Sequence, residues 1–547
     1  MTLETLATVA LAVAGAPQQH PAPVDQKLGT VRFATSCSAP VQPIFNRAVA
    51  FLHSFAFSMA SDGFNAVLSA DPKCAIAAWG IALSAWGNPF AAGIKPPAQI
   101  QRGLDAVRRA RDIGPSTDRE SAYVEAAARL YEHAESTDQR TRLLAYRDAM
   151  ADLSARQPAD TEAAIFHALA LAISADPADK TYAGQLAAGA TLEKLFAKLP
   201  DHPGLAHYII HSYDVPPLAD RALAAARRYS RIAPEVSHAL HMPSHTYTRV
   251  GDWQRSIDAN VAAAASAARE GSTAEELHAD DYRMYASLQT GRDRAAREIV
   301  AALPAIAARL DPNASGMGAP AAAGYFAIAA IPARYALERG AWAEAAQLEV
   351  RPSPVPFADA TTYFARAIGA ARVGDTAGAR AALDALERIQ ESLVQRHEGY
   401  WSEQVGIQRA AGGAWLAFAQ GRTDAALAEM SGAVERENRT EKNAITPGPL
   451  APAEEQLGEM LLARHEPGRA LAAFEATLRR EPNRFRALAG AAKAASEAGD
   501  GAAAGKYYGQ LLKLGSRADR PVRPELIEAA KVAGRSALSG RPPSGAR

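Results

Sequence analysis

The positions of small and large apolar residues in the C-terminal part of the chain repeat with a period of 34 residues. In one repeat these positions hold Leu457, Gly458, Leu461, Ala470, Phe474 and Pro482, and one period later Leu488, Ala504 and Tyr508 follow in phase. Small residues at fixed phases let two helices approach closely, and a period of this length is typical of a chain built from stacked copies of one unit. The pattern predicts pairs of antiparallel helices.

Glycines interrupt the pattern where one helix of a pair is expected to end and the next to begin. Gly340 and Gly374 lie 34 residues apart, and they open the Ala-rich segments GAWAEAAQL and GDTAGARAAL. Glycine ends helices because it adopts a left-handed conformation that other residues avoid. The same arrangement recurs at Gly251, Gly291, Gly421 and Gly499.

This spacing resembles the tetratricopeptide repeat, in which Leu-Gly, an aromatic residue, Ala-x3-Phe and Pro have fixed places. The resemblance implies an all-α fold, a tetratricopeptide-type solenoid of helical hairpins in a right-handed superhelix, and we expect about nine helix pairs. In that family the first helices line a concave groove. Proline-rich joints at 352–356 and 447–452 predict changes in the direction of the superhelix.

The chain is expected to divide by sequence character into consecutive parts. Residues 26–200 form N-terminal helical repeats, 201–300 histidine-rich repeats, 301–445 middle repeats, 446–538 C-terminal repeats and 539–547 a disordered tail. Residues 6–16 have the apolar length and small-residue ending of a signal peptide, although MTLET before them lacks Lys and Arg. With a signal peptide, residues 1–25 are leader and linker and the protein is periplasmic or secreted; without one it is cytoplasmic.

Composition excludes two classes of partner. The 547 residues include 59 Lys and Arg and 59 Asp and Glu, so the formal net charge is zero and no basic field attracts nucleic acid. No apolar run reaches the ~20 residues of a membrane-spanning helix. The two cysteines, Cys37 and Cys74, are candidates for a disulfide bond in an oxidising compartment, or for two separate thiols.

Histidines gather in the repeats of residues 201–300. Six of the 13 fall within 44 residues: His202, His207, His211, His238, His241 and His245. Residues four apart lie on one face of a helix, and two pairs have this spacing, His207/His211 and His241/His245. The second pair lies 34 residues after the first. Equivalent positions of neighbouring repeats therefore carry the same side chains.

This arrangement predicts a transition-metal site in the concave groove. Packed helices lie ~8–10 Å apart and metal–imidazole bonds are ~2.0–2.1 Å long, so imidazoles from two helices meet one ion or hold two ions side by side. Neutral imidazole suits Cu, Fe and Zn alike. The core of a single site is expected to be His207, His211, His241 and His245, with His238 beside it. The two triads of a paired site are expected to be His202/His207/His211 and His238/His241/His245.

Four further residues are candidates for the margin of the site. Asp214 follows the first histidine helix as a carboxylate ligand or as an acceptor for an imidazole N–H. His278 and Asp281 continue the inward-facing stripe one helix further, and His53 lies at an undetermined phase. His202 directly precedes Pro203 and is alternatively a helix cap, while Pro243 should kink the second histidine helix.

The strings DHPGLAHYIIHSYD and HALHMPSHTYTRVGDW resemble those of a group of bacterial tetratricopeptide-repeat proteins. The group's N-terminal pattern also appears here, as Ser36-Cys37, Leu52-His53-Ser54-Phe55, Asp71-Pro72-Lys73-Cys74-Ala75 and Trp79-Gly80. The resemblance extends over most of the chain. It implies a shared fold and a shared site, without an assigned activity.

Two functions follow from these features. In the first, the protein binds one or two transition-metal ions and is a metal-dependent enzyme, for which copper or iron redox chemistry is favoured over zinc hydrolysis. In the second, it is a non-catalytic scaffold that binds a peptide or protein partner in the groove. In either case the groove is expected to hold a small-molecule or peptide ligand. The sequence indicates neither the substrate nor the oligomeric state.

Overall fold

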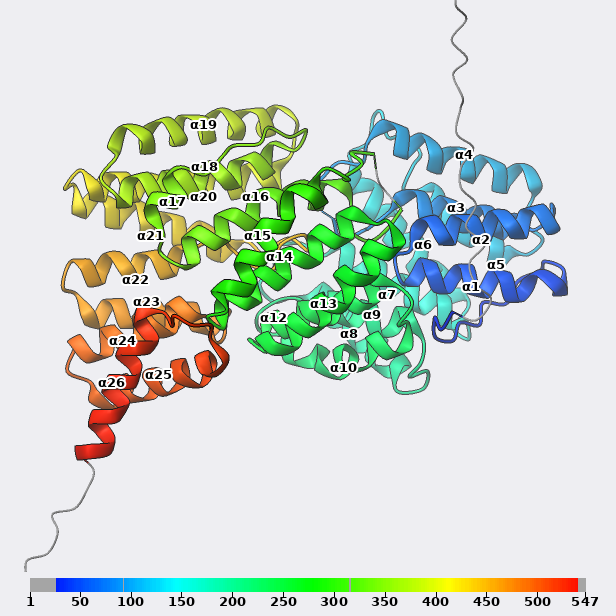
Figure 1. Ribbon diagram of the computed structural model, residues 1–547. Coiled ribbons are helices and arrows are strands. Elements are labelled where there is room, and N and C mark those ends of the chain that lie inside the picture. The colour runs from blue at the N-terminus through cyan, green and yellow to red at the C-terminus, as the bar shows by residue number, and fades with distance from the viewer. Residues whose placement is uncertain (1–25, 92, 314–315, 540–547) are drawn as a thin grey trace, which may run out of the picture.

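The computed structural model describes residues 26–91, 93–313 and 316–539, and these residues form helices and loops without a strand. The predicted all-α fold with helices packed in pairs is confirmed. Figure 1 shows the helices stacked along the chain, with α1–α10 at one end, α16–α26 at the other and α12–α15 between them. No helix of the described ranges has the length and hydropathy to cross a membrane. The predicted leader and linker, and the predicted tail beyond residue 539, lie outside the described residues.

The expectation of about nine helix pairs was too low, because the described part of the chain contains 26 α-helices. Many of the additional ones precede residue 200, where turn glycines are sparse. Several of these helices begin instead at a capping side chain: the side chains of Thr117, Asp138 and Asp160 each accept a hydrogen bond from a backbone N–H of the helix that follows. The capping residues were the signal that the glycine pattern missed.

The N-terminal helices pack around an aromatic core. The ring of Phe33 lies 5.3 Å from the ring of Trp79 and 5.1 Å from that of Tyr123. A disulfide bond joins Cys37, which precedes these helices, to Cys74, the residue before α3. In order, the elements are η1 (Ala39–Val41), α1 (Gln42–His53), α2 (Phe57–Ala70), α3 (Ala75–Trp86), α4 (Pro97–Ile113), α5 (Asp118–Ala128), α6 (Gln139–Arg156), α7 (Thr161–Ser174) and α8 (Ala183–Phe196).

The histidine-rich repeats follow the predicted turn chemistry. Gly251 and Gly291 both have a φ of 69°, and Asp252 caps the next helix through the N–H of Arg255. Pro243 divides the second histidine helix into two segments, as predicted. The elements are α9 (Pro203–Ser212), η2 (Ala219–Ala222), α10 (Leu223–Ile232), α11 (Ser237–His241), α12 (Pro243–Arg249), α13 (Trp253–Glu270), α14 (Thr273–Gln289) and α15 (Asp293–Ala307).

The C-terminal repeats show why the Ala-x3-Phe pattern recurs. A Cβ atom on Gly490 would lie 2.4 Å from the ring of Phe474, and one on Gly458 would lie 2.9 Å from it, so this ring fills the space that two small residues leave. The elements are α16 (Ala321–Glu338), α17 (Trp342–Ala346), α18 (Pro356–Arg372), α19 (Thr376–Gln395), α20 (Gly399–Ala419), α21 (Thr423–Arg439), α22 (Ala453–Ala463), α23 (Pro467–Arg480), α24 (Phe485–Glu497), α25 (Gly501–Leu514), η3 (Gly515–Arg517) and α26 (Pro524–Ser539).

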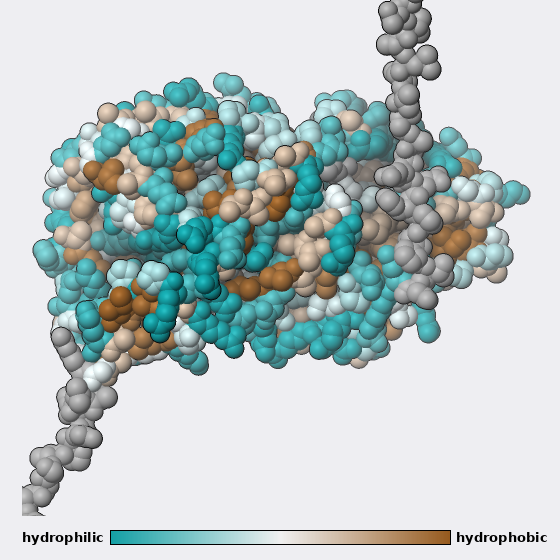
Figure 2. Space-filling model, in the orientation of Figure 1, coloured by the Kyte–Doolittle hydropathy of each residue, from teal (hydrophilic) through white to brown (hydrophobic). Residues whose placement is uncertain are grey.

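The loop between α21 and α22 connects the two ends of the molecule. The hydroxyl of Tyr282 in α14 donates to the carbonyl of Thr446 at 3.0 Å, and Arg334 in α16 donates to the carbonyl of Gly448 at 3.0 Å. Most of the apolar core lies in two parts, one from residues 28–247 with Met317 and one from residues 319–529. Figure 2 shows apolar residues on this face as separate patches among hydrophilic ones. The loop therefore brings C-terminal residues against α14 of the histidine-rich repeats.

Candidate metal centre

Eight buried histidines lie close together inside the protein. His53 ends α1, His202 precedes α9, and the others lie in α9, α11, α12 and α14. None of the eight is more than 8% exposed. The sequence placed the site in an open groove. The structure corrects this, because the imidazoles are enclosed between helices and by chain segments from other parts of the fold.

The first histidine group consists of His207, His211 and His238. One ligand atom from each lies within 4.8 Å of the others. All three Nε2 atoms are buried and have no hydrogen-bond partner among the described residues. A buried nitrogen without a partner is costly, so three of them within one small group of side chains favour a ligand that accepts their lone pairs.

Hydrogen bonds at the opposite ring nitrogens fix the orientation of this group. Nδ1 of His207 donates to the backbone carbonyl of His53 at 2.6 Å, and Nδ1 of His238 donates to Oε1 of Glu275 at 3.0 Å. In the neutral rings the proton therefore lies on Nδ1 and the lone pair on Nε2. Metal-binding histidines are held in the same manner, by a carbonyl or carboxylate on the nitrogen that does not bind the ion.

Apolar and small residues close the space around the first histidine group. The ring of Phe90 stacks on that of His211 at 4.0 Å with an interplanar angle of 10°, and the ring of Phe55 lies 4.3 Å from that of His207. A Cβ on Gly318 would lie 2.3 Å from the His238 ring, so only glycine fits at this contact. These neighbours exclude water and leave little freedom to the imidazoles.

The second histidine group consists of His241, His245 and His278, whose ligand atoms also lie within 4.8 Å of one another. Nδ1 of His241 donates to Oδ1 of Asn260 at 2.7 Å, and Nδ1 of His245 donates to Oδ2 of Asp214 at 2.9 Å. Their Nε2 atoms then both carry lone pairs, yet they lie 3.0 Å apart. A cation between them relieves this repulsion, and two nitrogens each ~2.0–2.1 Å from one ion lie ~3 Å apart.

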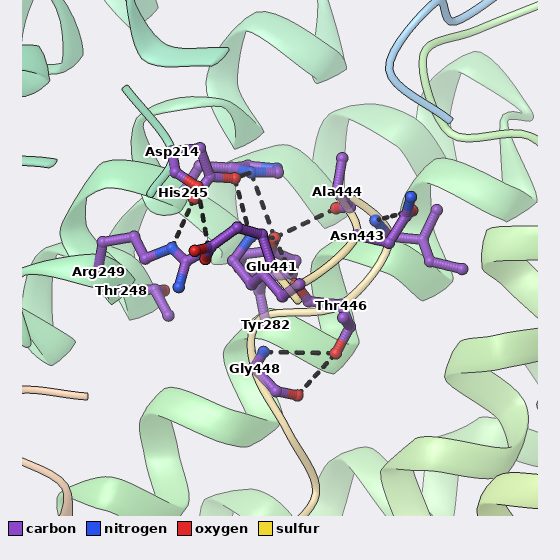
Figure 3. Close-up of polar contacts among 12 residues, drawn as sticks. Asp214, His245, Thr248, Arg249, Tyr282, Glu441, Asn443, Ala444, Thr446 and Gly448 are labelled. Atoms are coloured by element: carbon purple, nitrogen blue, oxygen red, sulfur yellow. Dashed lines mark hydrogen bonds and ion pairs between the residues drawn. The ribbon is translucent and has the colours of Figure 1, made fainter. Parts of the chain in front are cut away.

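The loop between α21 and α22 lies beside His245 of the second group, together with Asp214 and Tyr282, as Figure 3 shows. Nζ of Lys442 and Nε of Arg249 each lie 2.8 Å from a carboxylate oxygen of Asp214. Burial alone would raise the pKa of Asp214, but Lys442, Arg249 and the bond from His245 hold it well below its usual value. Asp214 is therefore a charged acceptor for His245 rather than a ligand.

A third group holds its own hydrogen bonds. The carboxylate of Glu162 lies 2.9 Å from Nε2 of His53 on one oxygen and 2.9 Å from Nε2 of His202 on the other. Burial would raise the pKa of Glu162, but these two imidazoles lower it well below its usual value. His202 occupies the N-cap position of α9, as the alternative interpretation had it, but its side chain makes no capping bond there. This group could also hold an ion, but each Nε2 already has a partner, and the backbone carbonyl of His53 accepts the hydrogen bond from His207 of the first group.

The structure regroups the predicted ligands. His202 was predicted to lie with His207 and His211, but it contacts Glu162 instead, and His238 completes that group. His278 lies with His241 and His245. The two groups are adjacent, with ring centres of His211 and His245 5.7 Å apart and those of His238 and His241 6.1 Å apart. Asp281 does not reach either group, because its carboxylate forms a fully buried ion pair with Arg334 at 2.8 Å.

Burial keeps these imidazoles neutral. Desolvation lowers the pKa of His207, His211 and His241 well below the ordinary value. It lowers the pKa of His245 to about 4 and that of His278 to about 3. Neutral imidazole is the form that binds metal, so these five ligands are ready for an ion at neutral pH.

Comparison with known proteins gives distant likenesses only. No protein-family model and no curated protein matches the chain. Among solved structures it is similar to one titled as the crystal structure of the APC/C hetero-tetramer Cut9-Hcn1, at 13% identity over 91% of this chain and 90% of that chain with a TM-score of 0.33. A human IFIT1 dimer with m7Gppp-AAAA matches at 10% identity over 80% and 90% with a TM-score of 0.36. The P58(IPK) TPR domain matches at 13% over 69% and 99% with a TM-score of 0.22. The resemblance to the bacterial histidine-motif group stays a prediction.

Proposed function

We propose that this protein binds two transition-metal ions, one in each histidine group. The observation that carries the proposal is the first histidine group itself, whose three rings offer ligand atoms within 4.8 Å of one another and each have a buried Nε2 without a partner among the described residues. The second ion is supported by the Nε2 atoms of His241 and His245, which lie 3.0 Å apart and both carry lone pairs when Nδ1 holds the proton. Three imidazoles per ion leave a further coordination position open, as in metal sites that carry out chemistry.

The ligand type favours copper, with iron and zinc as the alternatives. Neutral imidazole suits all three metals, and at a nitrogen site Cu binds more tightly than Fe or Zn. Two adjacent copper or iron ions supply redox chemistry when bound, so we propose an oxidoreductase rather than a zinc hydrolase. The chain contributes fixed tautomers through Glu275, Asp214 and Asn260, and Phe55 and Phe90 exclude water from the ions.

We propose in addition that the protein is exported to the periplasm or secreted. The Cys37–Cys74 disulfide supports this, since disulfides persist in oxidising compartments and are rare in the cytosol. The signal-like residues 6–16 agree with it. The N-terminal sequence of the mature protein, isolated from the periplasmic fraction of a bacterium that expresses it, tests the proposal.

The test of the metal proposal is elemental analysis of protein purified without an affinity tag, followed by titration with Cu(II) and measurement of oxygen consumption. We expect the protein to bind two equivalents of copper through nitrogen ligands and to consume oxygen when a reductant is present. Protein that takes up no copper, iron or zinc and binds a peptide in the groove would replace the proposal with the scaffold function.

A further inference from the structure

A cavity of about 450 Å³ lies outside the first histidine group. That volume lies within the range of small-molecule sites. Its apolar walls include Ile94, Met317, Tyr325, Val355 and Phe357. They come from the loop between α3 and α4, from the chain before α16 and its first turns, and from the start of α18. Segments that are far apart in sequence therefore form one mainly apolar chamber.

Positive charges outnumber negative ones on the wall of this cavity. Three cationic side chains line it, Lys95, Arg102 and Arg396, against a single carboxylate, Glu398. The guanidinium groups of Arg102 and Arg396 make no hydrogen bond or ion pair with any residue that the structure describes. The cavity thus combines an apolar body with an excess of cations that have free donors.

Lys95 is the cation held most closely in place. Its Nζ donates to the carbonyl of Asn88 at 2.8 Å and lies 5.5 Å from the centre of the Trp86 ring, with no carboxylate bonded to it among the described residues. Burial without a counter-ion lowers the pKa of Lys95 to about 8. An ammonium group in this position is stabilised by an anion that enters the cavity.

The same segment connects the cavity to the first histidine group. Nδ2 of Asn88, which lines the cavity, donates to the carbonyl of Gly318 at 2.7 Å, and Gly318 packs directly on the His238 ring. Phe90, whose N–H donates to Oδ1 of Asn88, stacks on His211. A molecule in the cavity is therefore separated from these two imidazoles by one layer of residues.

We propose that this cavity binds an organic anion, a carboxylate with an apolar or aromatic body. Lys95 forms the ion pair with the carboxylate, Arg102 and Arg396 draw the anion in, and Tyr325 and Phe357 pack on the body. The binding depends on the cavity alone and not on the proposed metal function.

Three probes that differ only in their head group test the binding: 3-phenylpropionate, 3-phenyl-1-propanol and 3-phenylpropylammonium. Calorimetric titration of the full chain should show the carboxylate binding at least about tenfold more tightly than the other two, the effect of one charge-assisted contact. Lys95→Met should remove that preference. Lys198→Met, which removes an exposed lysine outside the cavity lining, is the matched control and should retain it.

A second variant and a metal count separate this proposal from the metal function. Arg396→Met, at an exposed position, should weaken 3-phenylpropionate binding without affecting folding, and Lys95→Met should keep the copper content of the unmodified chain. A chain with both His207→Ala and His241→Ala should lose copper and still bind the carboxylate. Equal affinity for the three probes, or unchanged carboxylate affinity in both cavity variants, overturns the proposal whatever the copper content.

Discussion

Replacing Glu275 should weaken metal binding at the first histidine group without removing a ligand. Oε1 of Glu275, a residue only 2% exposed, accepts hydrogen bonds from Nδ1 of His238 at 3.0 Å and from the N–H of Ala319 at 2.7 Å. It thus holds the imidazole in the tautomer that binds metal and raises its basicity. Loss of such a partner costs ~10–100-fold in metal affinity, or ~1.4–2.7 kcal/mol. Glu275→Gln keeps an acceptor and loses the charge, so it should fall near the lower limit, and Glu275→Ala near the upper one.

The neighbouring residue provides the control. Glu276 pairs with Arg309, whose side chain is 47% exposed, and has no contact with a histidine among the described residues. Competition with a chelator of known affinity gives the two dissociation constants in each variant. The affinity of the second group should change less, because Glu275 acts on His278 there through its charge alone and forms no hydrogen bond with it among the described residues. If Glu275→Ala binds both ions as tightly as Glu276→Ala, the hydrogen bond has no part in metal binding and the reasoning fails.

Three further predictions concern packing, covalent links and acid. Gly318→Ala should displace His238, remove the first ion and lower the free energy of unfolding by ~1–3 kcal/mol. Gly432→Ala is the control, because a Cβ there meets no atom, and it should leave both metal binding and stability unchanged. Chelator titration and urea melts would measure the two effects. Replacing both Cys37 and Cys74 by Ser opens a link across 37 residues and should destabilise the N-terminal repeats by ~2–4 kcal/mol, with metal content unchanged. The pKa of His245 is lowered to about 4 in the folded protein and is ~6.5 in the unfolded chain. As the pH falls below ~6.5, the imidazole of His245 therefore binds a proton in the unfolded chain while it stays neutral in the folded protein. Stability of the metal-free protein should therefore fall as pH drops from 6.5 to 4, by ~1.4 kcal/mol per pH unit for this residue, and urea melts that stay constant over that range would contradict the burial of a neutral ring.

The architecture could be predicted because its determinants are local. A helix end needs a residue that tolerates positive φ, and Gly251, Gly291 and Gly374 supply it at predicted positions. A close helix contact needs a small residue opposite a large one, as at Gly490 and Phe474. Capping side chains such as Asp138 carry the same information for the N-terminal helices, and they can be found in a sequence once they are sought.

The grouping of the histidines could not be predicted from repeat spacing alone. Their place on one predicted helix puts His238 with His241 and His245, but its ring lies 5.1 Å from that of His207, and it groups with His207 and His211. Lys442 contacts Asp214 although the two residues lie 228 positions apart, and only the fold of the whole chain brings them together. Acceptors for an imidazole N–H, such as Asn260, have no sequence signature, because any oxygen atom that lies close to the ring can accept the hydrogen bond.

The count of metal ions per chain in four proteins tests the central claim most directly. The unmodified chain, His207→Ala, His241→Ala and the double variant would be loaded with Cu(II), freed of excess copper by gel filtration and analysed by mass spectrometry of the metal. Two separate three-imidazole groups predict about two ions, one, one and none. Equal copper in all four proteins, or loss of all copper from either single variant, would contradict two independent metal sites.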